Sequence, residues 1–211
     1  MKDYYESFCI KKNLIGMIFG FGCIFFIVFT MHNLYAYFLM VGVTLPMIGV
    51  STLQYSMEQD EISNYDQMLL TFPLLRKEIV QAKLTATLLF TLISNMVVSL
   101  SIMMIYVFLY HAIDFQTGLL VWIAGFILSF IFTAINSMGF FWLGNKRGSI
   151  FYIIFMIILA VTYVGANFSI GIEQILSLGT NILILIGVIL AIVMNVISYF
   201  ACVKIYTKKH S

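Results

Sequence analysis

Residues 84–110 read LTATLLFTLISNMVVSLSIMMIYVFLY and contain no charged side chain. An α-helix rises about 1.5 Å per residue, so about 20 apolar residues cross the ~30 Å hydrocarbon core of a bilayer. Lipid cannot satisfy exposed backbone groups, and a spanning segment must therefore be a helix or a strand of a closed barrel. Barrel strands are shorter and alternate between apolar and polar residues. The stretch predicts a transmembrane helix.

Similar uncharged runs lie on both sides of this stretch, and they are residues 14–31, 34–55, 118–143, 149–167 and 181–203. The composition agrees, because 62% of the 211 residues are hydrophobic and only 9% are charged. A soluble domain of this length needs more charges to cover its surface. We therefore expect an all-α polytopic membrane protein with six transmembrane helices, in which residues 1–211 form a single transmembrane domain.

The basic residues predict the orientation of these spans. All 11 Lys and Arg residues precede the first run, follow the sixth, or lie between the second and third or the fourth and fifth runs. The other three connections contain none. Basic residues near span ends stay in the cytoplasm, so we expect both termini and the 56–83 connection to be cytoplasmic. The sequence therefore predicts a protein that crosses its membrane several times.

Residues 1–13 combine aromatic and basic side chains, a pattern typical of a helix in the membrane interface. They predict an amphipathic elbow that leads into the first span. A frayed terminus is the alternative.

Several function classes lack their required residues. The net charge of +2 gives no indication of a nucleic-acid partner. The spans contain no ionisable side chain of the kind that gradient-driven carriers and voltage sensors use, although backbone carbonyls at a broken helix could still bind Na⁺. The sequence has no phosphate-binding loop, metal motif or catalytic constellation. We therefore expect no enzyme and no cofactor in this chain, and any energy for uphill transport must come from a separate polypeptide.

The long polar connection between the second and third spans reads SMEQDEISNYDQMLLTFPLLRKEIVQAK over residues 56–83. Ser63 and Asp66 form a variant of the capping box, which predicts a short helix over 64–71. Pro73 cannot continue that helix but fits the first turn of the next one. That next helix, with Thr71 or Phe72 as its cap, would run into the third span. The pattern predicts a lever that transmits force, and a solvated linker whose charges only set topology is the alternative.

This connection resembles the cytoplasmic signature of small permease subunits of bacterial ATP-binding cassette exporters, the type-2 permease class. The matching residues are Glu61, Asn64, Tyr65, Leu69, Leu70, Pro73, Arg76, Lys77, Ile79, Val80 and Lys83. The predicted topology agrees with that class over the whole chain, and the resemblance implies a multi-pass location in the bacterial cytoplasmic (plasma) membrane. Phe72 is a departure, because relatives usually have Leu before the proline. The chain's size and general character are also similar to exporters of antimicrobial or cytolytic peptides.

The resemblance implies that the short helix is a coupling helix, seated in a groove of a cytoplasmic ATPase subunit that binds ATP and Mg. The implied contact surface is Glu61, Asn64, Tyr65, Asp66, Met68 and Leu69, with Leu70 beside it. Pro73, Arg76 and Lys77 would form the corner and the shaft, although anchoring at the membrane surface is an alternative role for Arg76 and Lys77. The implied further partners are a second permease copy or a paralogue, membrane lipids, and an amphipathic peptide or small-molecule cargo.

Two features inside the spans leave alternatives open. Asn95 and Asn136 are the amides best placed for a substrate pathway, and hydrogen bonding to a neighbouring helix is their alternative role. Ser129, Thr133 and Ser137 form a small-residue stripe that lets helices approach closely, either within the subunit or between subunits. For the whole chain, the alternative to a transport subunit is a non-transporting immunity or sensor module that binds a partner through residues 56–83.

Overall fold

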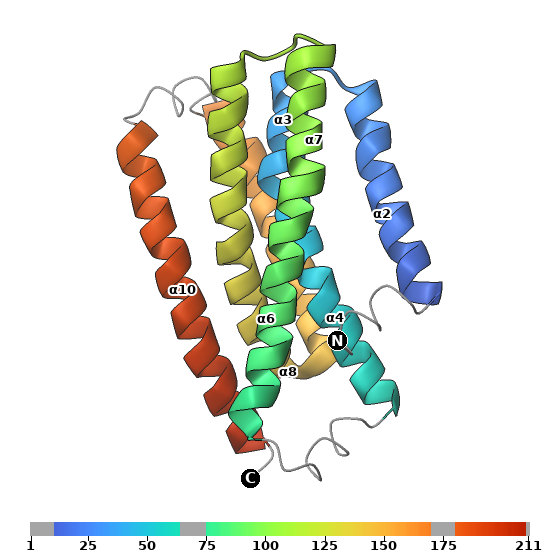
Figure 1. Ribbon diagram of the computed structural model, residues 1–211, viewed down its shortest axis with the longest axis vertical. Helices are drawn as coiled ribbons and strands as arrows, with labels where there is room; N and C mark the ends of the chain where they lie inside the picture. The colour runs from blue at the N-terminus through green and yellow to red at the C-terminus, as the bar shows by residue number, and fades with distance from the viewer. Residues whose placement is uncertain (1–10, 64–74, 170–179, 210–211) are drawn as a thin grey trace.

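The computed structural model describes residues 11–63, 75–169 and 180–209, and every regular element within these ranges is helical (Figure 1). The α-helices are α2 (Lys11–Thr30), α3 (Leu34–Leu39), α4 (Leu45–Ser63), α6 (Arg76–Ser94), α7 (Leu100–Met104), α8 (Phe115–Ser169) and α10 (Thr180–Lys209). Short π-helical segments continue some of these helices, and they are η1 (Met40–Thr44), η2 (Asn95–Ser99) and η3 (Ile105–Leu109). The expectation of an all-α chain is confirmed over the described residues.

Within the described residues, three helices are long and apolar enough to cross a membrane, and they are Arg76–Leu109, Phe115–Thr162 and Leu183–Lys209. Leu14–Thr30 is a shorter apolar helix. The exposed faces of these helices carry large apolar side chains, and residues such as Phe19, Ile157 and Ile192 are more than half exposed. Such faces suit a lipid environment rather than water.

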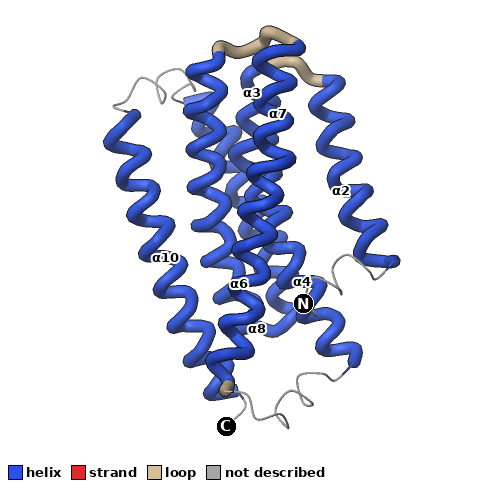
Figure 2. Tube along the Cα trace, viewed as in Figure 1, coloured by secondary structure: helices blue, strands red, loops and turns tan. Residues whose placement is uncertain are grey.

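The turns that follow Thr30 and Leu109 lie at the same end of the bundle (Figure 2). The turn after Thr30 ends at Asn33, whose side chain caps α3 by accepting a hydrogen bond from the Ala36 amide at 2.8 Å. At the same end, the His32 ring lies 4.0 Å from the Tyr110 ring, centroid to centroid. The predicted turn between the first two runs is confirmed.

A sharp reversal at Gly144 divides α8 into two helices that pack side by side. Gly144 has φ 78 and ψ 177, a backbone conformation that is essentially restricted to glycine. On either side of it, a Cβ placed at Gly139 would lie 2.7 Å from the Phe151 ring, and one placed at Gly148 would lie 2.7 Å from the Phe140 ring. The prediction of a connection here is confirmed, but the helix resumes by Lys146, so the turn is tighter than the predicted gap between residues 143 and 149.

Two hydrophobic clusters hold the bundle together. One lies toward the loop end and joins α2, α3, η3 and α8, with the Tyr37 hydroxyl donating to the Gly118 carbonyl at 2.7 Å. The other lies toward the Gly144 end, where Val80, Phe140, Phe141, Cys202 and Tyr206 are buried together. This second cluster joins the ends of α4, α6, α8 and α10.

The helix boundaries correct part of the predicted lever. Leu75 has extended backbone, φ −72 and ψ 137, and serves as the N-cap of α6. Its amide donates to Glu78 Oε2 at 3.0 Å. The expectation that a helix capped by Thr71 or Phe72 runs unbroken through Arg76 is therefore wrong, because the chain is extended just before Arg76. The predicted short helix at 64–71, residues 1–10 of the predicted elbow, and the connection at 170–179 lie outside the described residues.

Candidate functional site

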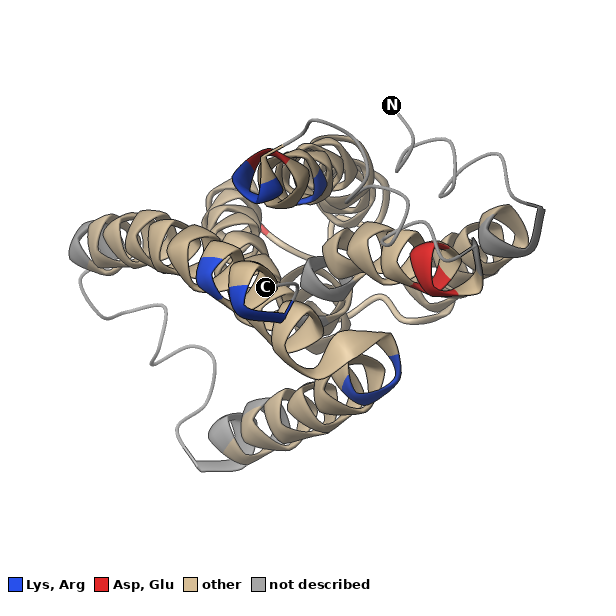
Figure 3. Cartoon of the chain, turned by 90° about the horizontal axis from the view of Figure 1, so that it is seen from below, with Lys and Arg blue, Asp and Glu red and all other residues tan. Residues whose placement is uncertain are grey.

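Charged side chains mark the end of the bundle that flanks residues 64–74. Figure 3 views the molecule from that end and shows Lys and Arg at the start of α6, at the α8 reversal and at the end of α10, with acidic residues at the end of α4. Asp114 belongs to the opposite end, where it precedes α8. The described charged residues thus gather at the end of the bundle where α4 ends and α6 begins. These two helix ends flank residues 64–74, which the sequence predicts to act as a lever.

A buried ion pair joins the two helices that enter and leave this segment. Lys83 Nζ of α6 donates to Asp60 Oδ2 of α4, and the exposed fractions of the two side chains are only 6% and 1%. A buried charge is costly unless it is paired, and removing one partner leaves the other uncompensated. The pair therefore holds α4 and α6 together a short distance from where each meets residues 64–74. Sequence reasoning assigned both residues to the polar connection and missed their pairing.

Two further contacts tie the same region to the rest of the bundle. Glu61 Oε1 accepts a hydrogen bond from the Asn145 amide at 3.3 Å, next to the Gly144 reversal. Arg76 Nη1 donates to the Thr207 carbonyl at 3.3 Å, near the end of α10. Glu61 and Arg76 thus connect the end of α4 to α8 and the start of α6 to α10.

The other predicted site residues have different outcomes. Lys77 is exposed and makes no hydrogen bond or ion pair with the described part of the chain. The remaining residues of the predicted coupling surface and corner are outside the described residues, and they are Asn64, Tyr65, Asp66, Met68, Leu69, Leu70 and Pro73. Their predicted roles stay predictions.

Beyond the ion pair, buried polar side chains continue along α6 and η2 at helical spacing. Thr87, Thr91, Asn95 and Ser99 follow Lys83 at intervals of four residues, and each is at most 1% exposed. Residues four apart lie on one face of a helix. This repeat from Lys83 onward is the sequence signal that could have placed Lys83 inside the bundle.

A matching row on α8 faces this polar face of α6. Ser129 Oγ donates to Asn95 Oδ1 at 3.1 Å, and the hydroxyls of Thr133 and Thr91 lie 3.2 Å apart. The Ser129–Thr133–Ser137 stripe therefore packs within the subunit, which settles for Ser129 and Thr133 the alternative that the sequence left open.

The two candidate pathway amides are completely buried in this subunit. Asn95 Nδ2 donates to the Thr91 carbonyl at 2.8 Å, so both polar atoms of that amide have partners. Asn136 Nδ2 donates to the Phe132 carbonyl at 2.9 Å, whereas its Oδ1 has no hydrogen-bond partner among the described residues. Helix-to-helix hydrogen bonding is thus observed for Asn95, and a place on a substrate pathway stays a prediction for both amides.

The family model of ABC-2 family transporter proteins matches residues 1–207. The chain belongs to this family. No curated protein and no solved structure matches the chain. The match covers nearly the whole of this ABC-2 transporter chain, including residues 64–74 and the two helices that flank them. It confirms the resemblance to the permease class. As a member of this family, the chain is a membrane component of a transporter.

Proposed function

We propose that this chain is the permease subunit of an ATP-binding cassette exporter, in which a separate cytoplasmic ATPase drives the export of amphipathic cargo such as peptides or drugs. The observation that carries the proposal is the family match over residues 1–207. ATP and Mg would bind to the ATPase subunit, and a second permease copy or a paralogue would complete the pore.

The proposed topology has six spans with both termini in the cytoplasm of a bacterial cell. The distribution of Lys and Arg supports it, since the basic residues of the described helices lie at the end that carries the Gly144 reversal. The reversal also supports it, because it divides Phe115–Thr162 into two antiparallel segments. The end with Asp60, Lys83 and Gly144 would then face the cytoplasm.

In this proposal, residues 64–74 receive force from the ATPase and the flanking contacts distribute it. The Asp60–Lys83 pair would make α4 and α6 move together. The Glu61 and Arg76 contacts would carry the displacement to the α8 reversal and to α10. Displacement of one segment could thereby change the packing of several spans at once, since packed helices shift as units rather than deform continuously.

The test begins with purification of the tagged chain from its native host and identification of any ATP-binding subunit that copurifies. Deletion of Asn64–Leu70 is expected to abolish both the copurification and the stimulated ATP hydrolysis. The matched control is Asp114→Asn, at the opposite end of the bundle, which should leave both unchanged. A stably inserted protein that neither binds nor stimulates an ATPase would contradict the proposal and favour the non-transporting module.

A further inference from the structure

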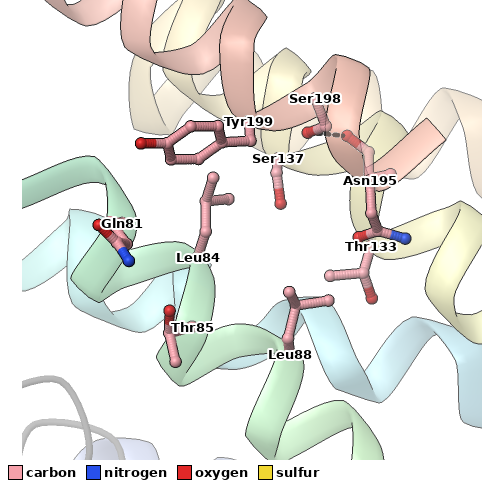
Figure 4. A pocket seen from close by; sticks show the side chains of 10 residues that line it. Gln81, Leu84, Thr85, Leu88, Thr133, Ser137, Asn195, Ser198 and Tyr199 are labelled. Carbon is pink, nitrogen blue, oxygen red and sulfur yellow. Dashed lines mark hydrogen bonds between the residues drawn. The ribbon is translucent and has the colours of Figure 1, made fainter. Parts of the chain in front are cut away.

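A small pocket opens between α6, α8 and α10, away from the Asp60–Lys83 pair. Its volume is about 100 Å³, and Figure 4 shows the side chains that surround it. They are Gln81, Leu84, Thr85 and Leu88 of α6, Thr133, Ala134 and Ser137 of α8, and Asn195, Ser198 and Tyr199 of α10. Three helices that are distant in sequence thus contribute polar groups to one site.

One of these polar groups is buried without a partner. Ser137 is 0% exposed, and its Oγ has no hydrogen-bond partner among the described residues. Figure 4 shows this hydroxyl pointing into the space between the Leu84 and Asn195 side chains. By contrast, Ser198 Oγ in the same wall donates to the Ala134 carbonyl at 2.9 Å. A buried hydroxyl normally finds a hydrogen-bond partner. The unpartnered hydroxyl of Ser137 therefore indicates that a ligand supplies one.

The pocket continues into a larger apolar groove. This groove has a volume of about 380 Å³ and shares Leu88 and Asn195 with the pocket. Its other lining residues are Phe126, Ile127, Phe130, Val188, Ala191, Ile192 and Val196. Pocket and groove together offer a polar end and an apolar end, which is the shape of a site for an amphiphile.

The orientation of the site matches a lipid of the adjacent leaflet. Ser137 precedes the Gly144 reversal by about 10 Å along the helix, whereas Phe126 lies about two and a half times as far from it. The headgroup region of a bilayer is roughly 5–8 Å thick on each side of the hydrocarbon core. With the reversal at the membrane surface, as in the proposed topology, Ser137 lies a few ångströms below the headgroup region, next to the ester ends of the acyl chains, and the apolar groove extends among those chains.

The uncharged lining of the site indicates which class of lipid it binds. None of the described residues that line the pocket or the groove is Asp, Glu, Lys or Arg. The lining itself offers no cation to a phosphate, whereas hydroxyl and ester groups could bond to Ser137, Thr85 and Gln81. We propose that the site binds an uncharged glycerolipid, with its glycerol hydroxyl or ester at Ser137 and one acyl chain in the groove. The depth of the site rests on the topology given under the proposed function, whereas the binding itself requires neither an ATPase nor transport.

The test uses the full chain in nanodiscs with a photoreactive, clickable diacylglycerol. Labelling is expected in α6 and α10, with competition by unlabelled diacylglycerol but not by phosphatidylglycerol. Ser137→Ala should reduce labelling about fivefold, the effect of one lost hydrogen bond of ~1 kcal/mol. Val188→Trp, which fills the groove, should reduce it at least about tenfold through overpacking.

The control for the groove variant is Val193→Trp, because Val193 is 46% exposed and Val188 is 40% exposed, but only Val188 lines the groove. Labelling that falls in Val188→Trp and persists in Val193→Trp supports the site. Equal labelling of both variants, or equal competition by phosphatidylglycerol, would overturn the proposal. These outcomes can be read even if Ser137→Ala does not fold, since they depend on two surface substitutions.

Discussion

Lys83 and Asp60 pair inside the bundle although 22 residues of polar connection separate them in the sequence. Their pairing links the two helices that flank residues 64–74. Lys83 is also the first member of a buried polar row that continues along α6 and η2 to Ser99.

Breaking this pair from one side should be strongly destabilising. Lys83→Met or Asp60→Leu leaves one buried charge uncompensated and should cost about 3–5 kcal/mol of stability. The double variant, which removes both charges, should recover most of that loss. Thermal unfolding of the detergent-purified protein measures the difference. Single variants as stable as the double variant would show that the pair is not buried.

The same double variant distinguishes the effect of the ion pair on the stability of the protein from its effect on ATPase stimulation. If the pair transmits force, a stable Asp60→Leu/Lys83→Met protein should still bind the ATPase but stimulate less ATP hydrolysis than the unaltered chain. The exchanged pair, Asp60→Lys/Lys83→Asp, restores opposite charges and should recover part of the stimulation. Full stimulation by the uncharged double variant would assign the pair a purely structural role.

Gly144 should be intolerant of a side chain. Gly144→Ala places a Cβ at φ 78 and ψ 177 and should cost about 1–3 kcal/mol. Gly165→Ala is the matched control, because a Cβ there meets nothing within 4 Å and alanine favours a helix by about 1 kcal/mol over glycine. Urea or thermal unfolding should therefore show opposite shifts for the two variants. Shifts of the same sign would contradict the reversal at Gly144.

The contact between Thr91 and Thr133 can be measured by a double-mutant cycle. Valine at each position removes the hydroxyl and keeps the shape, and the coupling energy should be about 0.6 kcal/mol, the average between membrane helices. Thr91 paired with Thr162 is the control, because Thr162 bonds only to the Ile158 carbonyl of its own helix and should show no coupling. A zero value for Thr91 and Thr133 would remove this link between α6 and α8.

Arg76 and Lys77 should differ in importance. Arg76→Gln removes the donor to the Thr207 carbonyl, whereas Lys77→Gln removes an exposed charge that makes no hydrogen bond or ion pair with a described residue. The first variant should weaken ATPase stimulation more than the second, although such exposed contacts contribute only about 0.2–1 kcal/mol to stability. Equal effects would favour membrane-surface anchoring for both side chains.

The sequence predicted the helices well because hydrophobic runs are long and the charges between them are sparse. It also predicted breaks near Asn33 and near Gly144, because uncharged runs end on either side of these positions. It placed the start of α6 too early, since a proline is compatible with a helix start but does not require one. The Asp60–Lys83 pair could not be predicted from local patterns, because it depends on the packing of α4 against α6. The polar row on α6 was visible as a four-residue repeat, but its partners on α8 became clear only in three dimensions.

The most direct test of the central claim is cargo accumulation in inverted vesicles that contain the chain and its ATPase. An ATP-binding cassette exporter should accumulate an amphipathic peptide when ATP is supplied, continue to do so after an uncoupler collapses the ion gradients, and lose this activity when Asn64–Leu70 is deleted. Accumulation that stops with the uncoupler while ATP remains high, or that survives the deletion, would contradict the account.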